Sequence, residues 1–137
     1  LGGAGYDLRL KEVYLLKTDS FLGVDERRTP DVEKAEGDAY VLLPDDYVLV
    51  ETVEKVNMPE DLLARVLNRS TLFRCGCSLY NALVDPGYHG ALTFGLKNHS
   101  QKEFTVEKGA RIAQIVFEQV IGETEGYDGK YQGGKVV

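Results

Sequence analysis

The chain has 137 residues and a mass of 15.2 kDa, with 43% hydrophobic and 28% charged residues. These values fit one domain with an ordinary core, and no apolar run approaches the roughly 20 residues that a membrane-spanning helix needs. The formal net charge is −6 and the isoelectric point is near 4.9. General DNA- and RNA-binding proteins need a basic stripe, so we expect no nucleic-acid or membrane partner. A small anionic ligand remains compatible with this charge, because a few arginines or a divalent cation can reverse the field in a cleft.

Two cysteines, Cys75 and Cys77, stand one residue apart and indicate the compartment. A disulfide between them would close a strained ring, so we expect no disulfide framework and interpret both as small, buried or half-buried apolar side chains. This usage is typical of a reducing compartment. The first residues do not resemble a signal peptide, and because the chain opens on Leu1 rather than Met, we expect native residues upstream. We therefore predict a cytoplasmic protein.

The first clear strand signals surround a turn. β-branched and aromatic residues fill 39–43 and 47–53, and the Pro-Asp-Asp sequence at 44–46 is a typical turn former. This pattern predicts two paired antiparallel strands. After Pro59, apolar residues recur with helical spacing, so the pattern alone favours a short helix or a turn over 59–67.

Further strands are predicted over 78–84, 91–96, 103–106 and 111–120, each bounded by turn residues. Many short strands separated by turns indicate an all-β sandwich or barrel. Two stretches look loose. One is the charged, turn-rich segment 19–38, and the other is the segment 122–134, which contains five glycines. We expect this second stretch to be mobile unless a ligand orders it.

Two motifs in the first half of the chain carry possible chemistry. In residues 3–10, a Gly-Ala-Gly run that permits close backbone approach is followed by the carboxylate of Asp7. Arg69 followed by Ser70 offers a fork of N–H donors and a hydroxyl, a combination that suits phosphate oxygens. Each motif alone also has an ordinary structural explanation.

Two further motifs follow in the second half. Residues 84–90 place Asp85 on a glycine turn, with an aromatic residue three positions later. Residues 108–118 lead from a glycine turn into a strand whose apolar run is interrupted by Arg111 and Gln114. All four motifs gain weight because their order and spacing recur together in one known group of proteins.

The order of motifs resembles that of the superfamily containing deoxyuridine triphosphatase (dUTPase) and dCTP deaminase, over residues 3–134. The matching motifs are residues 4–8, Arg69-Ser70, 85–90 and 109–114, and the segments closest to the deaminase branch are 51–62, 69–74, 84–87 and 129–132. The resemblance implies a distorted all-β barrel, assembled as a homotrimer with its active sites at the subunit interfaces. It also implies that residues 59–67 form a turn feeding a strand rather than a helix.

The two activities of this superfamily differ at one position. In the deaminases the catalytic glutamate lies ten residues after the aspartate of the third motif, and that position is Gly95 here. Its neighbours Phe94 and Leu96 cannot shuttle protons in its place. The fifth dUTPase motif, a glycine-rich tail with Arg and Phe, is not matched, because residues 127–134 contain neither.

The resemblance therefore implies a dUTPase of the deaminase-like branch, which converts dUTP and water to dUMP and pyrophosphate with Mg²⁺ held chiefly by the triphosphate. Asp85 is implied as the catalytic residue that orients and activates the attacking water. The implied phosphate-binding residues are Arg69, Ser70, Gln114, Arg111 and Lys130; the sugar- and base-binding residues are Tyr88, Asn81, Ala82, Leu83 and Tyr131; and Asp7 reaches the metal through water.

Two other functions stay open at this point: a dCTP deaminase or bifunctional deaminase/dUTPase, and a catalytically silent nucleotide-binding homologue. Single residues also have structural alternatives, since Asp85 could cap its turn, Tyr88 could be half-buried packing, and Arg111 could pair with an acid. We expect residues 1–121 to form the barrel domain and residues 122–137 to form a flexible tail that closes over the nucleotide.

Overall fold

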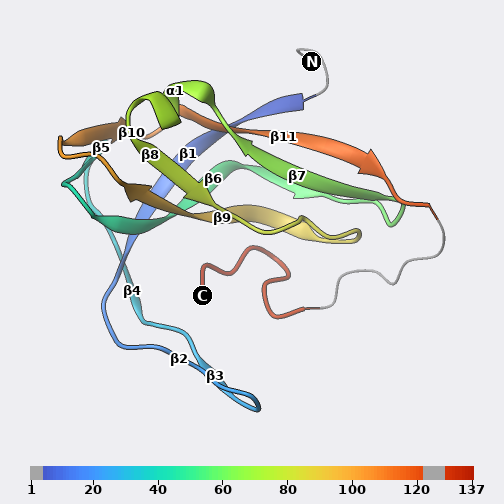
Figure 1. Ribbon diagram of the computed structural model, residues 1–137. Helices are drawn as coiled ribbons and strands as arrows, with labels where there is room; N and C mark the ends of the chain where they lie inside the picture. The colour runs from blue at the N-terminus through green and yellow to red at the C-terminus, as the bar shows by residue number, and fades with distance from the viewer. Residues whose placement is uncertain (1–4, 122–128) are drawn as a thin grey trace.

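Strands dominate the protein, as predicted, and one short helix forms among the described residues. The computed structural model describes residues 5–121 and 129–137 (Figure 1). In chain order the elements are β1 (Gly5–Leu16), β2 (Phe21–Leu22), β3 (Arg27–Arg28), β4 (Val32–Lys34), β5 (Ala39–Leu42), β6 (Tyr47–Asn57), β7 (Leu62–Asn68), α1 (Ser70–Arg74), β8 (Cys77–Tyr80), β9 (His89–Asn98), β10 (Phe104–Glu107) and β11 (Arg111–Gln119). No helix in this part of the chain is long and apolar enough to cross a membrane.

Six strands form one antiparallel path in the order β7-β11-β1-β6-β9-β8. Strand β4 pairs with β1, and the two-stranded sheets β10-β5 and β2-β3 complete the fold. The path curls until its ends meet, where Ala64 of β7 and Val84, in the segment after β8, exchange two backbone hydrogen bonds of 3.0 Å. The predicted barrel is therefore confirmed as a nearly closed one.

The core lies inside this curled sheet, where side chains alternate between the interior and the outside. Val48 and Val50 of β6 and Phe94 and Leu96 of β9 are all at most 3% exposed. This two-residue period is the one expected of a strand with one buried face. Cys77 is also buried, as predicted, whereas the prediction that Cys75 is buried or half-buried is wrong, because its side chain is exposed; both thiols are free.

The helix predicted from the pattern of residues 59–67 is wrong, and the strand implied by the resemblance is confirmed. Strand β7 occupies Leu62–Asn68 and pairs with β11 over its whole length. Ala64 and Val66 point into the core, whereas Leu67 is 51% exposed. Several apolar residues outside the core made an alternating strand look helical in the sequence.

Two other predictions need correction. The turn after β5 forms, with Asp45 at φ 70° and the Asp46 N–H donating to the Leu43 carbonyl at 3.0 Å, but β5 and β6 do not pair with each other. Strand β5 pairs with β10, while β6 pairs with β1 and β9. The predicted strand 78–84 ends as β8 at Tyr80, and Val84 makes only the isolated bridge.

The two segments predicted to be loose differ. The segment 19–38 contains the short strands β2, β3 and β4, and β2 with β3 forms a hairpin that projects from the barrel (Figure 1). The first residues of the predicted tail, 122–128, lie outside the described residues. The last residues, 129–137, return to the barrel beside β9.

One buried amide ties three segments together. Asn98, fully buried at the end of β9, donates from Nδ2 to the carbonyl oxygens of Leu42 (3.0 Å) and Lys102 (2.7 Å). Its Oδ1 accepts from the backbone N–H and the hydroxyl of Ser100, both at 2.9 Å. The side chain therefore replaces regular strand pairing where β5, β9 and the loop before β10 converge.

We predict that Asn98→Ala lowers the free energy of unfolding by about 2–4 kcal/mol, because it leaves buried backbone groups without partners. Urea denaturation followed by circular dichroism measures this change. The control is Asn57→Ala, whose exposed side chain makes no hydrogen bond to the described residues, and which should stay within about 0.5 kcal/mol of the parent. Equal effects of the two substitutions would contradict the role given to Asn98.

Candidate active site

Strand pairing brings the first, second and fourth motifs onto one surface. Strand β11 lies between β1 and β7, so that Asp7 is opposite Gln114 and Gln114 is opposite Leu67. Arg69 follows directly after β7, and its Nη1 lies 2.6 Å from Oδ1 of Asp7. Nη1 of Arg111 lies 3.6 Å from Oδ2 of the same carboxylate. One carboxylate thus orients two guanidinium groups.

The cluster of Asp7, Arg69 and Arg111 carries one more positive than negative charge. The side chains of Asp7 and Arg69 are 33% and 28% exposed, so both can still reach solvent. A guanidinium has five N–H donors, and those not used on Asp7 can bind a second anion. Ser70 directly follows Arg69 in the chain, and Gln114 lies opposite Asp7 in the sheet; both residues are exposed. The arrangement suits the oxygens of a phosphate group.

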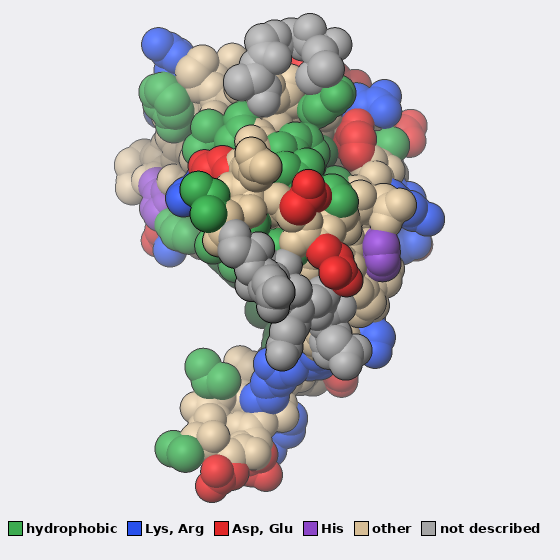
Figure 2. All heavy atoms as spheres, turned by 90° about the vertical axis from the view of Figure 1, so that its right-hand side faces the viewer, with side chains coloured by type: hydrophobic (Ala, Val, Ile, Leu, Met, Phe, Trp, Pro, Cys, Tyr) green, Lys and Arg blue, Asp and Glu red, His purple; other side chains and the backbone are tan. Residues whose placement is uncertain are grey.

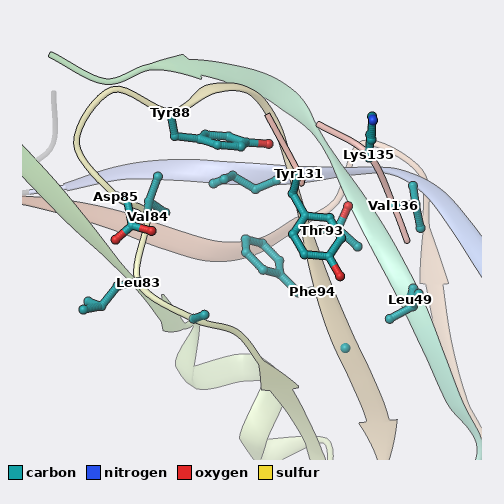
Figure 3. Close-up of a pocket in the computed structure, with 13 residues that line it drawn as sticks. Leu49, Leu83, Val84, Asp85, Tyr88, Thr93, Phe94, Tyr131, Lys135 and Val136 are labelled. Carbon is teal, nitrogen blue, oxygen red and sulfur yellow. The ribbon is translucent and has the colours of Figure 1, made fainter. Parts of the chain in front are cut away.

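A cavity of about 410 Å³ forms a second part of the candidate site, between the loop before β9, strand β9 and the last residues of the chain (Figure 3). Of the predicted residues, those that line it are Ala82, Leu83, Asp85, Tyr88 and Tyr131. Asn81 and Lys130 do not. The lining residues that the sequence analysis missed are Leu49, Val84, Leu92, Thr93, Phe94, Gly95, Lys135 and Val136.

The loop that carries Asp85 is fixed by backbone hydrogen bonds. The Tyr88 N–H donates to the Asp85 carbonyl at 3.2 Å, and Gly87 takes a left-handed conformation with φ 82°. The loop is also joined to Met58, whose N–H donates to the Tyr88 carbonyl at 2.9 Å. The exposed carboxylate of Asp85 makes no hydrogen bond or ion pair within residues 5–121 and 129–137. It can therefore act on a ligand or a water.

Tyr88 forms a fixed wall of this cavity. Its side chain is 8% exposed, and its hydroxyl donates to the Ala91 carbonyl at 2.5 Å. Figure 3 shows the ring and the carboxylate of Asp85 on the same loop, with Phe94 of β9 below them. Because both ends of the tyrosine are held, the ring presents a rigid apolar surface to a ligand.

Strand β9 contributes a hydroxyl and a glycine to the opposite wall. Thr93 Oγ1 is buried and has no hydrogen-bond partner among the described residues, which leaves it available to a ligand. At Gly95, an added Cβ would collide with the phenol oxygen of Tyr47. Burial, and less strongly the neighbouring Tyr80, raise the pKa of the Tyr47 phenol, so it stays protonated at neutral pH. The side-chain space of position 95 is thus filled by a neutral tyrosine.

The last residues of the chain are held against the start of β9. The Gln132 side chain accepts a hydrogen bond from the His89 N–H at 2.6 Å and donates to the Gly87 carbonyl at 3.2 Å. The Gly133 N–H donates to the His89 carbonyl at 2.8 Å. A Cβ at Gly90, where φ is 130°, would lie 2.6 Å from the Gly133 carbonyl carbon. Close backbone approach at Gly90 is therefore needed for this docking.

The two parts of the site are separate on a single chain. None of Asp7, Arg69 and Arg111 lines the cavity that contains Asp85. Ala64 pairs with the neighbour of Asp85, and Arg69 lies five residues further along the chain, which in extended form spans about 16 Å.

Comparison with known proteins places the chain among nucleotide enzymes. Residues 1–120 match the model of the dCTP deaminase-like family. A probable deoxyuridine 5'-triphosphate nucleotidohydrolase of Methanothermobacter thermautotrophicus is 38% identical over 129 residues, which cover 94% of this chain and 85% of that protein. A dCTP deaminase of Pyrococcus abyssi is 37% identical over 134 residues, which cover 96% of this chain and 79% of that protein.

Solved structures agree on the fold. A mutant dUTPase from phage phi11 of S. aureus, described with a structural Mg(II) ion, superposes with a TM-score of 0.60 at 16% identity, over 93% of this chain and 87% of that one. A barrel of this type, the four motifs and the family match across residues 1–120 agree with one another. The chain belongs to the dCTP deaminase-like family.

Proposed function

We propose that the protein hydrolyses dUTP to dUMP and pyrophosphate. The observation that carries this proposal is the free carboxylate of Asp85 at the edge of a cavity of nucleoside size. Strand β9, which also lines this cavity, has Gly95 in place of an acid. Relatives named as dUTP hydrolases at more than 30% identity support the same reaction. The unpaired thiols of Cys75 and Cys77 fit a reducing compartment, and we place the reaction in the cytoplasm.

The reaction breaks the phosphoanhydride bond between the α- and β-phosphates, and catalysis rests on positioning and charge neutralisation. Asp85 accepts a proton from the attacking water and orients it towards phosphorus. Arg69, Arg111, Ser70 and Gln114 hold the phosphate oxygens, and the surplus positive charge of the cluster around Asp7 favours the developing negative charge.

The site is shared between subunits of a homotrimer. The separation of Asp85 from Arg69 on one chain supports this assembly, because a triphosphate bound to Arg69 would meet the Asp85 carboxylate of a second copy. The phosphate-binding surface of one subunit and the nucleoside cavity of another then form one site.

Mg²⁺ fits this site as a companion of the substrate. The described residues contain no group of three His, Cys, Asp or Glu side chains able to hold a metal, and both oxygens of Asp7 face arginines. The triphosphate would supply most of the oxygen ligands, with Asp7 reaching the ion through water. When bound, the ion neutralises phosphate charge and fixes the triphosphate conformation.

The nucleoside is recognised in the cavity beside Asp85. Tyr88 lies under the deoxyribose and leaves no room for a 2′-hydroxyl, and backbone groups of Asn81, Ala82 and Leu83 read the uracil edge. Tyr131 covers the base or sugar from the tail, and Lys130 lies near the phosphates. The tail over residues 122–137 closes on the bound nucleotide, which the contacts of Gln132 with the loop of Asp85 support.

One of the relatives is named as a dCTP deaminase. The residues around position 95 do not support deamination of dCTP by this protein. Loss of ammonia from C4 of cytosine needs a group that moves protons between water, N3 and the leaving nitrogen. Gly95 offers none, and the phenol of Tyr47, with its raised pKa, stays a neutral donor. The protein is accordingly a hydrolase without deaminase activity.

We predict that Asp85→Asn lowers kcat for dUTP by about 10²–10⁴-fold, because the amide cannot take a proton from water. Pyrophosphate release measures turnover, and thermal unfolding shows that the fold is kept. Asp61→Asn, an exposed carboxylate elsewhere on the surface, serves as the control and should retain the parent rate. Near-parental turnover of Asp85→Asn would remove this residue from the mechanism.

Tyr88→Ala should reduce the preference for dUTP over UTP by about tenfold or more, since the wall that excludes the 2′-hydroxyl is lost. The ratio of kcat/KM for the two substrates is the measurement. Tyr88→Phe keeps the ring and removes the hydroxyl that donates to Ala91, so its ratio should stay close to that of the parent. If the Ala variant keeps the parental ratio, another residue excludes the ribose.

Incubation with dCTP and Mg²⁺ should release no ammonia, while dUTP is hydrolysed in the same buffer. Gly95→Glu should not gain deaminase activity, because a side chain at this position meets the Tyr47 phenol. Ammonia from dCTP with the parent protein would overturn the assignment in favour of a deaminase or bifunctional enzyme.

A further inference from the structure

The hairpin of β2 and β3 is not explained by the candidate site. Phe21 pairs with Arg28 and Leu22 with Arg27, and a hydrogen bond of 2.8 Å from the Gly23 N–H to the Glu26 carbonyl closes the turn. We call residues 17–31 the arm. Figure 2 shows it as a lobe below the barrel, with Lys and Arg side chains gathered where the two meet.

The arm contacts the chain's last residues, far from it in sequence. The Arg27 guanidinium carbon lies 5.8 Å from the ring centroid of Tyr131. Lys130 Nζ donates to Thr29 Oγ1 at 3.3 Å and lies 5.3 Å from the same ring. Two cations thus approach the ring that also lines the cavity of Asp85.

Arg27 has no competing partner in the described parts of the chain, where it makes no ion pair and no hydrogen bond through its side chain. Its neighbour Arg28 differs, because that guanidinium lies 5.9 Å from the ring of Phe21, within the arm itself. Adjacent arginines therefore serve different contacts, one to the tail and one inside the hairpin.

The last residues of the chain are held by two sets of contacts, one to the start of β9 and one to the arm. Gln132 and Gly133 bind the backbone around His89, downstream of the ring. Upstream, Lys130 and Tyr131 contact the arm through Thr29 and Arg27. Tyr131 lines the cavity together with Thr93 (Figure 3), and the upstream contacts hold Tyr131 there.

We propose that Arg27 is a positioning residue, which holds Tyr131 against the cavity of Asp85. The arm thereby contributes to the substrate-binding site. The effect on catalysis rests on the proposed function, because Tyr131 acts there on a bound nucleotide. The docking of the tail by the arm does not rest on it. A cation over a half-buried tyrosine at the surface is a modest interaction, so its loss shifts the docking equilibrium about two- to five-fold.

Hydrogen exchange of a peptide spanning residues 129–137, in the protein without nucleotide, tests the docking directly. Arg27→Ala should speed exchange of this peptide about two- to five-fold, and Arg27→Lys should restore part of the protection. Arg28→Ala is the matched control and should exchange like the parent. Gly90→Ala serves as the reference for a displaced tail, because its added Cβ collides with the Gly133 backbone; its exchange rate gives the value expected when residues 129–137 are undocked.

Steady-state kinetics with dUTP test the effect of Arg27 on substrate binding and turnover. Arg27→Ala should raise KM about two- to five-fold with a smaller change in kcat, whereas Arg28→Ala should change neither. Equal tail exchange in the Arg27→Ala and Arg28→Ala proteins would overturn the proposal, even with full dUTP hydrolysis. Faster exchange in Arg27→Ala alone, in a protein that fails to hydrolyse dUTP, would support the docking and overturn only the proposed function.

Discussion

The pair of hydrogen bonds between Ala64 and Val84 is the contact on which the site most depends. It joins the two ends of a six-stranded path and turns an open sheet into a nearly closed barrel. Both residues are buried, with Ala64 fully inaccessible, so the join is made inside the core. Because Asp85 directly follows Val84, the same contact that closes the barrel fixes the start of the loop that carries Asp85. The turn through Gly87 and the hydrogen bonds to Met58 then set the direction of Tyr88.

Strand β11 organises the other part of the candidate site. Strand β11 lies between β1 and β7 and aligns Asp7, Gln114 and the end of β7, so that a carboxylate and two guanidinium groups meet at the surface. Each half of the proposed site is thus built by strand pairing, and each is incomplete alone. In the proposed homotrimer, activity would arise on assembly and would be lost on dissociation.

The sequence alone predicted the strands well where burial alternates, as over the first part of β6, because a period of two is visible in the residue types. It failed at residues 59–67, where exposed and half-buried leucines hid that period, and at β5, whose partner β10 lies far along the chain. The four motifs predicted the site residues that now cluster. They gave no sign of Tyr47 beside Gly95 or of Arg27 beside Tyr131, because such contacts depend on tertiary structure.

The division of the active site between subunits is tested most directly by mixing two inactive variants. Asp85→Asn and Arg69→Ala, each inactive alone, are unfolded together, refolded and assayed for pyrophosphate release from dUTP, with subunit exchange verified by mass spectrometry. A site that takes Asp85 from one subunit and Arg69 from another is intact in about a quarter of the positions of random hybrid trimers, so about a quarter of the parental activity should return. Hybrids as inactive as the single variants would contradict a site shared between subunits.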